Sequence, residues 1–146
     1  LDKSMLTPIP GEAWLRRQYA PSLRPVHHHP QGWHQDGALN FDFASSNGAQ
    51  NYPIRPMITC WIPLTPCGRT APSIRYEPRF RTHIVPVHRL QNCVADSRVS
   101  VLNAGDALLI HGGTLHQTAL HVKMDRNRMN IDFRFEMHSP SELFPA

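Results

Sequence analysis

The sequence has no apolar run long enough to cross a bilayer, and no hydrophobic stretch at its start that would serve as a signal peptide. Its three cysteines (Cys60, Cys67 and Cys93) form no C-x-x-C pair, which argues against a disulfide framework and a cysteine zinc site. Charged residues make up only 18% of the chain, and the formal charge of +4 is scattered along it. We therefore expect a cytoplasmic protein with reduced thiols that binds neither membrane nor nucleic acid.

Glycine is also sparse, with 8 residues against 14 prolines. So many prolines exclude long helices, because an internal proline removes a hydrogen bond and clashes with the preceding turn. The 146 residues contain no internal repeat and suffice for one domain, residues 1–146. We expect a mainly β domain with a helical flank at 1–22 and a β core at 23–138. The first residue is Leu1, so upstream residues can be missing.

The flank contains one predicted short helix, Pro10–Tyr19, in which Glu12 complements the N-terminal dipole. A turn-rich stretch is expected at 66–78. Strands are expected over residues 26–36, 57–64, 83–87, 107–111 and 114–120. The Gly112-Gly113 pair predicts a two-residue hairpin turn between the last two strands, which would place Leu109 opposite His116.

The most regular pattern is the strict alternation from Arg128 to Met137. One face of this predicted strand is apolar and the other is polar or charged. The apolar face comprises Met129, Ile131, Phe133, Phe135 and Met137. We expect it to pack outward under the helix while Arg128 points into an interior cavity. A sandwich with a solvated outer face would give the same pattern without any functional site.

The chain has ten histidines, roughly three times an ordinary share. In an extended strand, His34 and Asp36 would lie on the same side, and His116 is a third candidate ligand downstream. Two histidines and one carboxylate form the facial triad that binds non-haem Fe(II) and leaves three positions open. The alternative for these three residues is a structural hydrogen-bonding role. The run 27–29 cannot converge on one ion, because adjacent strand residues alternate faces.

A downstream arginine fits the same chemistry. 2-Oxoglutarate can chelate iron through its carboxylate and keto oxygen, and its far carboxylate then needs a fixed bidentate donor. Arg128 is the candidate because it begins the alternating strand, whereas Arg126 lies in the preceding loop. The hydroxyl of Thr118 would add one hydrogen bond; its alternative is an ordinary strand position.

Three segments, taken together and in order, resemble the phytanoyl-CoA dioxygenase family. They are WHQDG at 33–37, GDALLIHGGTLHQT at 105–118 and RMNIDFRF at 128–135. The resemblance implies a double-stranded β-helix (a cupin-like jelly roll) and an Fe(II)- and 2-oxoglutarate-dependent oxygenase. It implies that His34, Asp36 and His116 hold the iron and that Arg128 binds the co-substrate. His111 falls on a family position that does not ligate the metal.

The implied activity is hydroxylation of a small organic substrate by O2, with 2-oxoglutarate converted to succinate and CO2. Related halogenases carry a small residue at the position of Asp36, so hydroxylation is favoured. The alternatives are a jelly-roll metal- or ligand-binding protein without turnover, including a truncated oxygenase, and a cupin-like isomerase or hydrolase. We expect the loops 41–52 and 69–81 to flank the cavity mouth. The arginines at 75, 79 and 81 either bind an anionic group on the substrate or are merely solvated.

Overall fold

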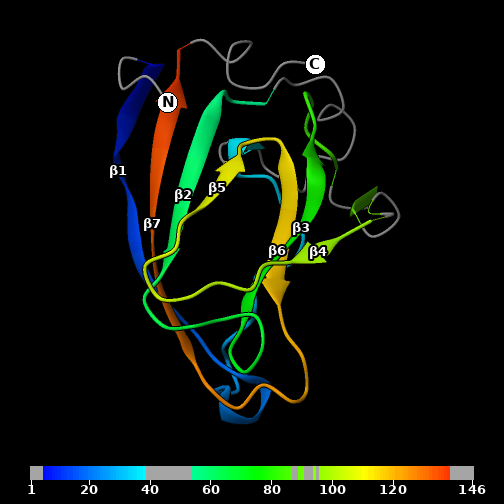
Figure 1. Cartoon of the computed structure of the whole chain (residues 1–146). Coiled ribbons are helices and arrows are strands. Elements are labelled where there is room, and N and C mark those ends of the chain that lie inside the picture. The colour runs from blue at the N-terminus through cyan, green and yellow to red at the C-terminus, as the bar shows by residue number, and fades with distance from the viewer. Residues whose placement is uncertain (1–4, 39–53, 87–88, 91–93, 95, 139–146) are drawn as a thin grey trace.

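The computed structural model describes residues 5–38, 54–86, 89–90, 94 and 96–138, which form two antiparallel sheets that face each other (Figure 1). The first sheet has the order β1-β7-β2-β5 and comprises β1 (Leu6–Gln18), β7 (Arg128–Met137), β2 (Met57–Pro63) and β5 (Leu108–His111). The second has the order β4-β3-β6 and comprises β4 (Arg98–Val99), β3 (Ser73–Phe80) and β6 (Thr114–Ala119). Short 3-10 turns occur at Pro21–Leu23 and Asp36–Ala38. This confirms the mainly β jelly roll. Among the described residues, no helix is long and apolar enough to span a membrane.

The predicted helix over Pro10–Tyr19 is wrong, because this segment belongs to strand β1. The sheet therefore begins at Leu6, and the helical flank assigned to residues 1–22 is wrong as well. β1 pairs with β7 along its length except for a bulge between Pro8 and Ala13. Pairing with a long neighbouring strand outweighs the local helix preference on which the prediction was based.

The hairpin predicted at Gly112-Gly113 does not form. β5 pairs with β2 and β6 pairs with β3, so the two glycines carry the chain from one sheet to the other. Neither glycine has a positive φ. Glycine is required there by space, because a Cβ on Gly113 would collide with the backbone oxygen of Arg81. As a result, the residue opposite His116 is Tyr76 and not Leu109.

The other predicted strands are confirmed only in part. The strands at 57–64, 107–111 and 114–120 correspond to β2, β5 and β6, and the alternating run is β7. The segment 26–36 contains only an isolated bridge at His34, and no described strand covers 83–87. The stretch 66–78, expected to be turns, instead includes the first part of β3. In the last case, proline and short polar residues hide a strand that pairs over long range with β6.

Strand β7 has the predicted two faces. Arg128, Asn130, Asp132 and Arg134 are buried inside, and the residues between them up to Phe135 are half-buried on the outer face. The predicted alternation of burial ends there, because Glu136 is half-buried and Met137 is buried. The predicted helix over that outer face is not seen. Between the sheets, one end of the interior is filled by an apolar cluster, Trp61, Cys67, Ala71, Ile74 and Ile110. The rest of the interior carries the polar side chains of β7, which positions charged groups around a cavity rather than in solvent.

Candidate metal centre

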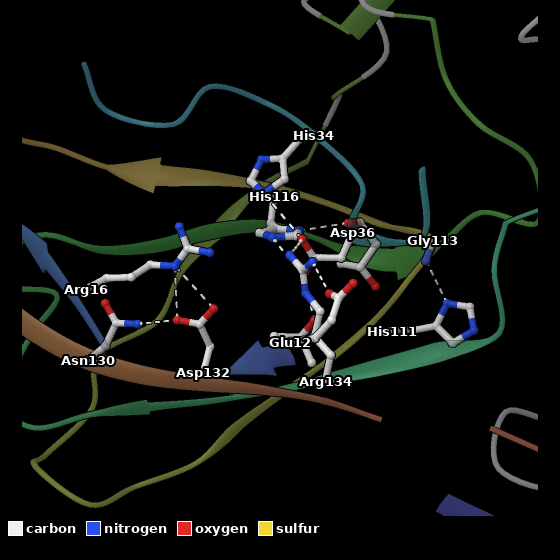
Figure 2. A network of polar contacts seen from close by, with 12 residues as sticks. Glu12, Arg16, His34, Asp36, His111, Gly113, His116, Asn130, Asp132 and Arg134 are labelled. Carbon is white, nitrogen blue, oxygen red and sulfur yellow. Dashed lines mark hydrogen bonds and ion pairs between the residues drawn. The ribbon is translucent and has the colours of Figure 1, made fainter. Parts of the chain in front are cut away.

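The structure brings His34, Asp36 and His116 together (Figure 2). One potential ligand atom from each lies within 4.8 Å of the other two, and no other such group of three occurs among the described residues. Nε2 of His34 is 3.6 Å from Asp36 Oδ1, and Nε2 of His116 is 3.7 Å from Asp36 Oδ2. The predicted convergence of these three side chains is confirmed.

The backbone sets this geometry through a two-way bridge between His34 and His116. The amide of His34 donates to the carbonyl of His116 at 2.9 Å, and the amide of His116 donates to the carbonyl of His34 at 3.1 Å. The two rings therefore lie side by side with centroids 4.1 Å apart. Asp36 reaches the same point from the 3-10 turn that follows. The predicted strand from His34 through Asp36 is wrong, since only His34 pairs.

Both histidines present the nitrogen that a metal needs. Nδ1 of His34 donates to the carbonyl oxygen of Gly32 at 2.7 Å, and Nδ1 of His116 donates to that of Thr114 at 3.0 Å. A carbonyl oxygen only accepts hydrogen bonds, so these contacts place the ring proton on Nδ1. The lone pair on each Nε2 is then free to bind a metal, and each ring is held in orientation.

Burial and neighbouring charge also hold His34 and Asp36 in the protonation states that metal binding requires. Burial, reinforced by the charge of His116, lowers the pKa of His34 from 6.5 to about 4, so its ring is neutral at pH 7. Burial alone would raise the pKa of Asp36, but His116 and Arg134 oppose this and keep it below its usual value. At neutral pH the pair consists of a neutral imidazole and a carboxylate.

A cavity of about 460 Å³ opens beside the three residues and is lined by Arg128 and Thr118. Arg128 is only 4% exposed, and its guanidinium lies over the ring of Trp61 at 4.8 Å. Its Nε and Nη1 atoms find no hydrogen-bond partner among the described residues. Burial lowers the pKa of Arg128 to about 10, which still leaves it charged at pH 7. Arg126 is exposed and does not line the cavity.

Sequence reasoning missed the groups that hold Asp36. The hydroxyl of Thr59 donates to Oδ2 at 2.6 Å, and Nη2 of Arg134 donates to Oδ1 at 2.9 Å. Nη1 of Arg134 donates to Glu12 at 2.8 Å. Arg134 lay on the recognised polar face of its strand, which was a usable signal. Glu12 was predicted to complement the dipole of a helix that does not form, so its contact with Arg134 was not anticipated.

A second polar network lies on the cavity wall (Figure 2). Nε of Arg16 donates to both oxygens of Asp132 at 3.2 Å, and the amide of Asn130 donates to Oδ1 at 2.9 Å. Burial raises the pKa of Asp132 despite the nearby charge of Arg16. These residues come from β1 and β7, which are paired, so this wall depends on the strand that was expected to be a helix.

The arginines expected to bind substrate lie elsewhere. Arg79 and Arg81 both pair with the buried carboxylate of Glu77, at 2.6 and 3.1 Å, and Arg75 donates to Ser97 at 3.4 Å. None of the three lines the large cavity. The segment 69–81 therefore does not supply the expected anion clamp there. The whole loop 41–52 lies outside the described residues, so its predicted place at the mouth stays a prediction.

Comparison with known proteins gives matches of structure alone. No family model and no curated protein sequence matches the chain. The solved structure of EvdMO1 covers 98% of this chain with a TM-score of 0.63 at 16% identity. EctD from S. alaskensis, solved with 2-oxoglutarate and 5-hydroxyectoine, covers 88% with a TM-score of 0.59 at 14% identity. The epimerase SnoN, in complex with Fe3+, alpha-ketoglutarate and nogalamycin RO, covers 87% with a TM-score of 0.53 at 17% identity.

The chain spans 28%, 46% and 48% of the lengths of EvdMO1, EctD and SnoN, respectively. At these identities the matches show the fold alone, a mainly β jelly roll that this chain shares with part of each of these proteins.

Proposed function

We propose that the protein is a non-haem Fe(II)- and 2-oxoglutarate-dependent oxygenase that hydroxylates a small organic substrate, as its resemblance to the phytanoyl-CoA dioxygenase family implies. The observation that carries this proposal is the convergence of His34, Asp36 and His116 with both Nε2 atoms available beside a cavity. EctD and SnoN, which share the fold, were solved with 2-oxoglutarate or alpha-ketoglutarate.

The donor set fits a divalent iron. Two neutral imidazoles and one carboxylate are the ligands of the facial triad, and they leave three positions for co-substrate and O2. Bound there, Fe(II) would supply the oxygen chemistry that couples decarboxylation of 2-oxoglutarate to hydroxylation. The carboxylate of Asp36 occupies the position that a halogenase leaves open, which favours hydroxylation.

The cavity also fits the co-substrate. Arg128 presents two buried N–H groups without partners among the described residues, and an unpaired buried charge is costly unless a ligand completes it. A carboxylate of 2-oxoglutarate bound in the cavity would supply the counter-charge and accept hydrogen bonds from the guanidinium. Thr118 lines the same cavity and can donate one further hydrogen bond. The position of Arg128 inside the cavity supports its assignment over that of the exposed Arg126.

The remaining cavity residues would shield the reacting groups from water and orient the substrate. Trp61 and Ile110 cover one side of the cavity with apolar surface, which limits water around the reacting groups. The half-buried His28 and the exposed His29 and Gln31 also line the cavity. A small substrate would enter there, while Arg128 holds the co-substrate at the inner end.

The direct test is succinate formation from 2-oxoglutarate by the full chain with Fe(II) and ascorbate, across a library of small metabolites. We expect release that depends on Fe(II) and a weak visible charge-transfer band when both are added without O2. Arg128→Met should form the band only at a much higher 2-oxoglutarate concentration, and Arg75→Met, outside the cavity, should form it at the normal concentration. Metal binding without the band or succinate would instead indicate a binding protein without turnover.

A further inference from the structure

The carboxylate of Asp36 is held by donors from the first sheet. Its backbone lies in a 3-10 turn that contacts β2, and its two hydrogen-bond donors, Thr59 and Arg134, belong to β2 and β7. Thr59 and Arg134 are direct partners in the register of β2 and β7. Two donors side by side on one sheet therefore fix both oxygens of a carboxylate whose own backbone is outside any strand.

Arg134 is in turn fixed by strand β1. Its side chain is 6% exposed, and Nη1 bonds Glu12 at 2.8 Å while the guanidinium lies 4.6 Å from the ring centroid of Trp14. Glu12 lies within the bulge of β1, and it contacts the same guanidinium as Trp14, two residues on. The two carboxylates of Glu12 and Asp36 therefore lie on different nitrogens of one guanidinium (Figure 2).

The charges in this row explain why a second carboxylate is useful. A lone Arg134 would neutralise Asp36 and reduce its attraction for a cation. With Glu12 on its other side, the row of two carboxylates and one guanidinium keeps one net negative charge. In a buried site, such a charge interacts strongly, since the effective dielectric constant is low.

We propose that Glu12 and Arg134 are positioning residues for the metal centre. Arg134 fixes the direction of the Asp36 carboxylate, and Glu12 offsets the charge that Arg134 brings. This inference rests on the proposed metal site and extends it. Neither residue is a proposed ligand: Arg134 bonds the ligand Asp36, and Glu12 bonds Arg134. An ordinary structural ion pair would stabilise the fold without affecting metal affinity.

The test is Co²⁺ titration of the metal-free full chain by calorimetry, with the visible Co²⁺ spectrum and thermal unfolding recorded in parallel. Glu12→Gln removes one charge with little change of shape, at a side chain that is 23% exposed. We expect about tenfold weaker Co²⁺ binding, the lower end of the usual effect of groups that support ligands. Glu136→Gln is the matched control, because it removes the same charge from the half-exposed Arg55–Glu136 pair outside the cavity.

Arg134→Lys provides a second test, because lysine keeps the charge but cannot donate to Asp36 and Glu12 in a fixed fork. We expect an altered Co²⁺ spectrum, since a freed Asp36 carboxylate can turn toward the metal. Unchanged affinity in Glu12→Gln, with an unchanged spectrum in Arg134→Lys, would overturn the inference. So would equal losses in Glu12→Gln and Glu136→Gln. Failure of the unmodified chain to bind Co²⁺ would instead refute the proposed function.

Discussion

Replacing Arg128 by methionine should have opposite effects on stability and on co-substrate binding. Methionine is unbranched and apolar, so it can occupy much of the same space beside Trp61 without a charge. In the absence of 2-oxoglutarate, the guanidinium is buried with two N–H groups that have no partner among the described residues. The substitution therefore removes an unfavourable group from the metal-free protein and a necessary one from the complex.

The magnitude follows from the pKa of Arg128. Burial lowers it from 12.5 to about 10, which corresponds to about 3 kcal/mol of cost for keeping the group charged in the folded state. Loss of the contact with Trp61 at 4.8 Å offsets about 1 kcal/mol of this. We expect Arg128→Met to raise the free energy of unfolding by about 2 kcal/mol. Loss of a charged hydrogen-bonding partner should weaken 2-oxoglutarate binding by about 2 kcal/mol, or roughly 30-fold.

The assay combines urea unfolding of the metal-free protein with calorimetric titration of 2-oxoglutarate into the Co²⁺-loaded protein. Arg126→Met is the matched control, because Arg126 is exposed and lies outside the cavity. The control should leave both quantities unchanged. If Arg128→Met destabilises the protein and binds 2-oxoglutarate normally, the guanidinium is a structural group and the reasoning is refuted. A loss of affinity confined to Arg126→Met would move the role to Arg126.

Three further outcomes are expected. Asp36→Ala should weaken Co²⁺ binding at least about 100-fold in a calorimetric titration and abolish succinate formation, because one of three ligands is lost; near-normal binding would contradict its assignment as a ligand. The pKa of His34 is depressed to about 4 in the folded state, so as the pH falls the unfolded chain binds a proton at His34 before the folded chain does. The metal-free protein should therefore lose about 3 kcal/mol of stability between pH 6.5 and pH 4. Urea unfolding across that range should show this slope, and His34→Asn should lack it. Gly113→Ala should lower the free energy of unfolding by at least about 2 kcal/mol in urea, because the new Cβ collides with the backbone oxygen of Arg81; unchanged stability would mean that the corner can relax.

The sequence by itself determined the features that depend on local chemistry and period. The alternation from Arg128 to Met137 predicted the bounds and the two faces of β7, because side chains on a strand repeat every two residues. The excess of proline over glycine indicated strands and not long helices, although β1 and β7, with 13 and 10 residues, are longer than the short strands expected. Residue types and order also selected His34, Asp36 and His116 from a histidine-rich chain. This selection did not need a correct backbone, since Asp36 lies in a turn and not in the predicted strand.

Only the tertiary structure decided which segments pair and which groups support the ligands. The segment Pro10–Tyr19 is compatible with a helix until β7 offers it a long partner, and a single sequence does not contain that pairing energy. For the same reason, Gly112-Gly113 was interpreted as a hairpin, although the steric limit on Gly113 comes from the distant Arg81. Glu12 and Arg134 meet Asp36 only because β1 and β7 lie next to each other in the first sheet, facing the turn that carries Asp36.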